Sequence, residues 1–209
     1  MGTHGRRGLR RLLLGSTAEE VVRTAPCPVL IVRHEEVAAT GPHGQPALLV
    51  PIDFSQHARV ALHHAKELAG LFKARLNLLH VVEEQLHPAF YNTGVLSVYD
   101  LIPNLEAQVR EELETFYRET KGPDLPMEIH VRHGHAAHEI VAFAEEAMPL
   151  LVVMATHGLR GVGHFLMGSV AEKIVRLSPV PVLTVKSFSK RLLTYAADEE
   201  TAEPSVVMP

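Results

Sequence analysis

The sequence contains a single cysteine, Cys27, and no large excess of charge of either sign. One cysteine excludes an intrachain disulfide framework and a cysteine-rich zinc site, and it suits a reducing compartment. No hydrophobic stretch approaches the length of about 18 residues that a membrane span needs, so the sequence predicts no membrane-spanning helix. A net charge of −4 gives no general attraction to nucleic acid.

The remaining composition is that of an ordinary globular chain. Hydrophobic residues make up 46% and charged residues 21%, which excludes a disordered polyelectrolyte, a collagen-like chain and a coiled coil. Residues 1–14 are basic and then briefly apolar, but Leu12–Leu14 is shorter than the apolar core of about 7 to 15 residues in a secretory signal. We therefore expect a cytoplasmic protein whose partners include neither nucleic acid nor membranes.

An internal repeat explains the length of 209 residues, which corresponds to about 1.4 ordinary domains. Residues 1–33 lie on residues 154–186 without a gap: Met-Gly-Thr-His-Gly matches Met-Ala-Thr-His-Gly, and Pro-Cys-Pro-Val-Leu matches Pro-Val-Pro-Val-Leu. Such self-similarity indicates a duplicated structural unit. The sequence thus predicts a C-terminal remnant of one domain at 1–34, a linker at 35–46, a complete domain at 47–187 and a flexible acidic tail at 188–209.

Strand and helix patterns alternate through the complete domain. Strands are expected at 47–52, 74–81, 127–132, 150–155 and 180–186, and helices at 55–72, 98–120, 136–147 and 169–177. Ser55 is a good N-cap for the first of these helices, whose apolar side includes Leu62, Ala65 and Leu71. Cys27 lies between two prolines and is expected to be a small buried residue. The alternation favours an α/β fold, an open parallel sheet with helices on both faces.

Two strand ends carry residues suited to a ligand, and parallel sheets bind ligands at such ends. The first strand is followed by Asp53. The fourth strand leads into the pattern Ala155-x2-Gly158-x9-Gly168-Ser169. Residues 2–16 carry the same pattern, with glycine at its first position. Glycines let the backbone approach a ligand closely, and the Gly-Ser step opens a helix whose N–H groups favour phosphate. The glycine spacing matches neither a P-loop nor a dinucleotide fingerprint.

These segments together resemble the universal stress protein family. The resemblance rests on Val-Pro-Ile-Asp-Phe-Ser at 50–55, Leu-Leu-His-Val at 78–81, Val-Arg-His-Gly at 131–134, Met-Ala-Thr-His-Gly through Gly-Ser-Val-Ala-Glu at 154–172, and Pro-Val-Pro-Val-Leu at 179–183. It implies an open five-stranded parallel sheet in the order 3-2-1-4-5, preceded by a helix–strand remnant. It also implies a regulatory stress-response module. One subgroup of the family binds ATP through a Gly-x2-Gly-x9-Gly-Ser/Thr loop, so the resemblance implies ATP binding as well.

The resemblance assigns roles by position, with ATP and Mg²⁺ as the expected ligands. Asp53 would hold the ribose. The backbone near Pro51 and Ile52, with Val81, would contact the adenine. The phosphates would lie against Gly158, Gly168, Ser169 and Val170. Ala155 stands where the family pattern has its first glycine, and its methyl group would narrow the approach to the ribose or phosphates.

Each of these residues also has a purely structural interpretation. Asp53 would cap a turn or the first helix, and Gly158 and Gly168 would serve only a tight turn. The dense histidines from His130 to His138 suggest a metal, but His130 and His133 fall on opposite faces of a strand. We therefore assign no metal site and no catalytic residue.

Two other functions remain open. One is a slow ATPase or self-phosphorylating protein, for which Ser169 and His157 are the candidates. The other is a nucleotide-free dimerisation module, because strand 180–186 is expected at the sheet edge, where strands recruit partners. The resemblance implies antiparallel pairing of this strand between domains. Val29–Arg33 would then pair with Val182–Lys186, either within one chain as a pseudo-dimer or across a homodimer.

Overall fold

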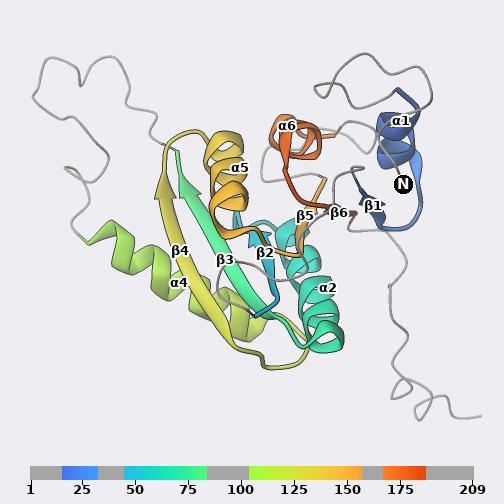
Figure 1. Cartoon of the computed structure of the whole chain (residues 1–209). Coiled ribbons are helices and arrows are strands. Elements are labelled where there is room, and N and C mark those ends of the chain that lie inside the picture. Colours follow the sequence, from blue (N-terminus) through green and yellow to red (C-terminus); the bar gives the residue numbers. More distant parts are fainter. Residues whose placement is uncertain (1–15, 33–44, 84–103, 157–166, 187–209) are drawn as a thin grey trace, which may run out of the picture.

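The computed structural model describes residues 16–32, 45–83, 104–156 and 167–186, which form one sheet with helices on both faces (Figure 1). The strands are β1 Val29–Ile31, β2 Ala47–Pro51, β3 Arg75–Val82, β4 Met127–His133, β5 Leu151–Ala155 and β6 Val182–Val185. The helices are α1 Ser16–Thr24, α2 Gln56–Phe72, α4 Leu105–Glu119, α5 Ala136–Ala147 and α6 Ser169–Leu177.

The strand order is β1-β6-β5-β2-β3-β4. Strands β2 to β6 are parallel to one another and follow the predicted order 3-2-1-4-5. One expectation was wrong: β6 is not a sheet edge. The sheet has six strands because β1, from the N-terminal repeat, pairs antiparallel with β6 and supplies hydrogen-bonding partners to its outer side.

The pairing of β1 with β6 takes place within the chain, which is one of the two arrangements that the sequence left open. Leu30 lies opposite Leu183 at the centre of the pairing. The segment is also fixed by Lys186, whose Nζ atom donates hydrogen bonds to the carbonyl oxygens of Arg23 at 2.6 Å and Ala25 at 3.0 Å, where α1 ends.

The sheet separates two cores because side chains alternate between the faces of a strand. Helices α2 and α4 cover one face, where Leu62 and Leu113 are fully buried. Helices α1, α5 and α6 cover the other, where Val22 and Ile174 are buried (Figure 1). Full burial of a leucine side chain contributes roughly 1.5–3 kcal/mol relative to exposure, so the two layers supply much of the stability.

Helix α2 begins as its sequence predicts and differs on its apolar side. Its buried stripe consists mainly of alanines, among them Ala58, Ala61, Ala65 and Ala69. Leu71, expected on that side, is 62% exposed. The reason is geometric: Leu71 stands two positions beyond Ala69, about 200° further round the helix.

Two further expectations were wrong. The helix predicted from 98 begins only at Leu105. Asn104 before it has the left-handed φ of 61°, which a right-handed helix does not accommodate; residues 98–103 lie outside the described part of the chain. Cys27 is exposed rather than buried. It lies in the turn between α1 and β1, ahead of the point where the strand joins the sheet.

Candidate functional site

The sheet changes winding direction between β2 and β5. The chain adds β3 and β4 on one side of β2 and β6 on the other side of β5. The register between β2 and β5 ends at Leu49↔Val152, whereas β2 and β3 stay paired as far as Pro51↔Leu79. The carboxyl ends of β2 and β5 are therefore unpaired with each other beyond this point, at the position where open α/β sheets bind their ligands.

Asp53 follows β2 at this position and organises a tight turn. Its Oδ1 atom accepts hydrogen bonds from the Ser55 N–H at 3.1 Å and the Ser55 hydroxyl at 2.6 Å. The Ser55 Oγ atom in turn accepts from the Ala58 N–H at 3.0 Å and caps α2. The structural interpretation of Asp53 as a turn-forming residue is therefore confirmed for its Oδ1 atom. The same contacts hold the half-buried carboxylate in a fixed orientation at the strand end.

The backbone of Ile52 is already engaged within the protein. Its N–H donates to the Leu79 carbonyl at 2.9 Å, and its carbonyl accepts from His80 Nδ1 at 2.7 Å. A carbonyl only accepts, so Nδ1 of His80 carries the proton. The ring of His80 lies 4.8 Å from that of Phe54. Sequence reasoning gave His80 no role, although a polar residue in the apolar run Leu-Leu-His-Val was a signal for one.

The loop after β5 is closed at its base. Thr156 donates its N–H to Val185 at 3.1 Å, and its carbonyl accepts from the Gly168 N–H at 2.9 Å. Gly158 and His157 lie on the part of the loop outside the described residues. Gly168 has φ −61° and ψ 147°, a conformation open to any residue, so turn geometry does not require glycine. A Cβ atom there would lie 3.4 Å from the Thr156 carbonyl oxygen.

Helix α6 begins directly after Gly168 without a side-chain cap. The Glu172 N–H donates to the Gly168 carbonyl at 2.9 Å, which is a hydrogen bond of the first helical turn. The N–H groups of Ser169 and Val170 lie ahead of Glu172, at the very start of the helix. Helices α2 and α5 differ, because Ser55 caps the first and Glu83 accepts from Ala136 at the start of the second. An uncapped helix start carries partial positive charge and favours an anion.

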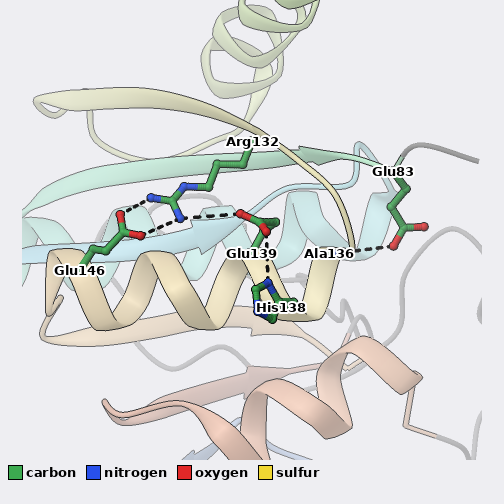
Figure 2. A network of polar contacts seen from close by, with 6 residues as sticks. All are labelled: Glu83, Arg132, Ala136, His138, Glu139 and Glu146. Carbon is green, nitrogen blue, oxygen red and sulfur yellow. Dashed lines mark hydrogen bonds and ion pairs between the residues drawn. The ribbon is translucent and has the colours of Figure 1, made fainter. Parts of the chain in front are cut away.

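The charged groups near the end of β4 pair with one another (Figure 2). The Arg132 guanidinium forms ion pairs with Glu146 and Glu139 of α5 and stacks over the Phe143 ring at 4.9 Å. Hydrogen bonding from Arg132 lowers the pKa of the exposed Glu146 carboxyl. His138 Nδ1 lies 3.2 Å from Glu139 Oε1. These contacts fasten α5 to the sheet, which is a structural role.

The described histidines do not assemble a metal centre. Within residues 16–32, 45–83, 104–156 and 167–186, no group of three His, Cys, Asp or Glu side chains could hold a metal ion. His130 instead packs its ring 4.6 Å from that of Phe143, and burial lowers its pKa. In the same part of the chain, no helix has the length and apolar character to cross a membrane.

Comparisons with known proteins agree with the resemblance seen in the sequence. The model of the universal stress protein family matches residues 1–33 and 47–186. A universal stress protein of Bacillus subtilis is 32% identical over 144 residues, which cover 66% of this chain and 97% of the relative. One from Mycobacterium tuberculosis is 28% identical over 193 residues, covering 89% of this chain and 60% of the relative. A solved structure from Methanocaldococcus jannaschii has a TM-score of 0.57 at 28% identity, covering 68% and 96% of the chains.

Proposed function

Because the chain belongs to the universal stress protein family, we propose that it is a regulatory, cytoplasmic stress-response module that binds ATP with Mg²⁺ at the carboxyl ends of β2 and β5. The observation that carries the proposal is the start of α6. Gly168 adopts a conformation that does not require glycine, and the helix behind it has no side-chain cap. A phosphate chain accounts for both features, because it needs close backbone approach and N–H donors.

The described residues divide the work of binding. The N–H groups of Ser169 and Val170 face the phosphates, while the N–H of Gly168 is taken by Thr156 and closes the loop. The Asp53 carboxylate accepts hydrogen bonds from the ribose hydroxyls. Pro51 and Val81 border the adenine; Gly158, to which the family pattern gives a phosphate contact, lies outside the described residues.

Two positions need refinement relative to the family pattern. Both backbone polar groups of Ile52 are engaged, so Ile52 offers the adenine chiefly van der Waals contact. Ala155 packs against the core on the α2 side of the sheet, whereas α6 covers the opposite side. Its methyl group therefore does not obstruct the start of α6, where the phosphates are proposed to bind. Ala155 thus gives no reason to replace ATP as the proposed ligand.

The direct experiment identifies nucleotides by mass spectrometry in protein purified without added ligand, followed by calorimetric titration with MgATP. Asp53→Asn keeps an oxygen for the Ser55 hydrogen bonds but removes the charge, so we expect ATP affinity to fall about tenfold. Gly168→Val places a branched side chain at the helix start and is expected to abolish binding.

Gly70→Ala, on the exposed side of α2, is the matched control and keeps the affinity of the parent chain. Equal ATP affinity in all four proteins contradicts the assignment of the site. A folded parent chain that neither carries nor binds ATP contradicts the proposal itself and leaves the nucleotide-free interaction module as the function. ATP turnover is not part of the proposal; phosphate release above the buffer rate would favour the slow ATPase instead.

A further inference from the structure

His80 of β3 holds the backbone directly ahead of Asp53. Its Nδ1 atom donates a hydrogen bond to the carbonyl oxygen of Ile52 at 2.7 Å. That carbonyl belongs to the peptide group that joins Ile52 to Asp53. Because a peptide group is planar, fixing its oxygen also fixes the direction in which the chain enters Asp53. The Ile52 N–H is held by the Leu79 carbonyl at 2.9 Å, so β3 anchors both polar groups of the preceding residue.

The residue after Asp53 has a strained backbone. Phe54 has a φ of 60°, in the left-handed region that bulky side chains rarely occupy. Such a conformation persists only where the surrounding structure imposes it. The Phe54 ring supplies that constraint, because its centre lies 4.8 Å from the His80 ring and 5.7 Å from the ring of Phe116. Phe116 of α4 is buried, with the Arg59 guanidinium 4.3 Å from its ring centre.

His80 therefore contacts the chain on both sides of Asp53, by a hydrogen bond to Ile52 and by a ring contact with Phe54. The carboxylate itself is oriented by Ser55, whose N–H and hydroxyl donate to Oδ1 at 3.1 Å and 2.6 Å. These two bonds place the carboxylate only as long as the turn keeps its shape. The contacts of His80 and Phe54 maintain that shape.

We propose that His80 is a positioning residue that presets the Asp53 carboxylate for the ribose hydroxyls of the bound nucleotide. This role rests on the proposed ATP site and adds the feature that makes the site prefer a ribonucleotide. A carboxylate accepts hydrogen bonds from both hydroxyls. It does so at lower cost when its position is fixed before binding, because less conformational freedom is then lost.

A positioning role differs from an ordinary core contact in which ligands it affects. Loss of a core contact that merely stabilises the fold lowers the affinity for every nucleotide alike. Loss of a positioning residue weakens only the contact between Asp53 and the ribose. The phosphates are proposed to bind at the start of α6, which follows β5, and β2 separates β5 from β3 in the sheet.

The first test compares ATP with dideoxy-ATP, the analogue that lacks both ribose hydroxyls, by calorimetric titration with Mg²⁺ present. We expect the parent chain to bind ATP about tenfold more tightly than the analogue. His80→Phe keeps a ring beside Phe54 and removes the hydrogen bond to Ile52. It should lower the affinity for ATP about fivefold and leave that for dideoxy-ATP within about twofold of the parent's.

Two further variants complete the comparison. His80→Asn places an amide N–H where Nδ1 stands and should recover most of the preference for ATP over the analogue. His130→Phe is the matched control, because His130 also packs against a phenylalanine ring, that of Phe143 at 4.6 Å. Phe143 belongs to α5 and to the core on the opposite face of the sheet. This control should keep the parent's preference for ATP.

The second test uses protein without nucleotide. Because the Ser55 N–H donates to Asp53 Oδ1, its hydrogen exchange, followed by NMR, reports whether the carboxylate is held in place. This amide should exchange about fivefold faster in His80→Phe than in the parent chain. His80→Asn and His130→Phe should exchange it at about the parental rate.

The outcomes distinguish a failure of His80's role from a failure of the ATP site. If the parent chain binds no ATP, the ATP site is wrong and the ribose preference with it. Faster exchange of the Ser55 amide in His80→Phe then still assigns the positioning of Asp53 to His80.

If the parent chain binds ATP, three results overturn the role of His80 and leave the ATP site standing. His80→Phe weakens binding of ATP and dideoxy-ATP equally. His80→Phe keeps the parent's preference and the parental exchange rate at Ser55. His130→Phe loses the preference to the same extent as His80→Phe.

Discussion

The Nζ atom of Lys66 lies 3.8 Å from the centre of the Tyr117 ring and donates a hydrogen bond to the Tyr117 carbonyl oxygen at 3.1 Å. A second bond reaches the carbonyl of Thr120 at 2.9 Å. This buried ammonium group of α2 therefore caps the C-terminal end of α4. Burial lowers the pKa of Lys66 and raises that of the Tyr117 hydroxyl.

Replacing Lys66 tests the value of this cap. Lys66→Met keeps the apolar part of the side chain and removes the ammonium group. The carbonyl groups of Tyr117 and Thr120 then lose the hydrogen bonds that this group donates. We expect the free energy of unfolding to fall by about 1–3 kcal/mol in chemical denaturation. The exposed Lys121→Met is the control and should change stability little. Equal stability of both variants with the parent would show that the cap contributes nothing.

Gly122 lies against the side chain of Lys66, where a larger residue would be strained. Its φ of 127° is a conformation that other residues rarely adopt, and a Cβ atom would lie 2.9 Å from the Lys66 Cβ atom. Gly122→Ala should therefore destabilise the protein by about 1–3 kcal/mol. Gly70→Ala, in the C-terminal part of α2 with its Cβ position 3.5 Å from Pro123, should instead stabilise by about 0.5–1 kcal/mol. Thermal unfolding of the two variants should move in opposite directions.

Ser55 separates the stability of the site from its binding. Its Oγ atom caps α2 through the Ala58 N–H, so Ser55→Ala should cost about 0.5–2 kcal/mol of unfolding free energy. Gln56→Ala, exposed in the same turn, should cost much less. ATP affinity should change less in Ser55→Ala than in Asp53→Asn. Ser55 only positions the Asp53 carboxylate, whereas Asp53→Asn removes its charge. The reverse order of affinities would contradict the role given to Asp53.

His130 makes stability depend on pH. Burial lowers its pKa in the folded protein from 6.5, so the unfolded chain binds this proton more readily. The stabilisation is complete above about pH 6.5 and is lost as the pH falls through the folded-state pKa. His130→Phe keeps the aromatic contact with Phe143 and should lose less stability between about pH 7.5 and 5.5 than the parent does. An equal loss of stability in His130→Phe and in the parent over this range would show that His130 contributes nothing to the pH dependence.

Signals confined to a few neighbouring residues predicted their structures well. The helix expected at 169–177 begins at Ser169 and ends at Leu177, because Gly168 precedes it and Pro179 follows it. Ser55 caps α2 as expected for a serine ahead of an amphipathic stretch. The order of the five parallel strands followed from the family resemblance, which the fold confirms.

Predictions failed where a residue's environment depends on distant parts of the chain. Periodicity placed Leu71 on the apolar side of α2, but only packing against the sheet selects the stripe that is buried. The hydrogen bond from His80 to Ile52 joins two neighbouring parts of the sheet, and no local pattern specifies it. Cys27 is exposed because the strand that would have buried it starts two residues later.

The sequence by itself determined that residues 1–33 repeat residues 154–186, since self-similarity needs no structure to be detected. It also determined the glycine-containing loop and the acidic strand end that make up the candidate ATP site. Only the tertiary structure decided that β1 turns back onto β6 with Leu30 opposite Leu183. Strands with matching sequences can pair within a chain or between chains, so the choice depends on the path of the backbone and on the anchor at Lys186.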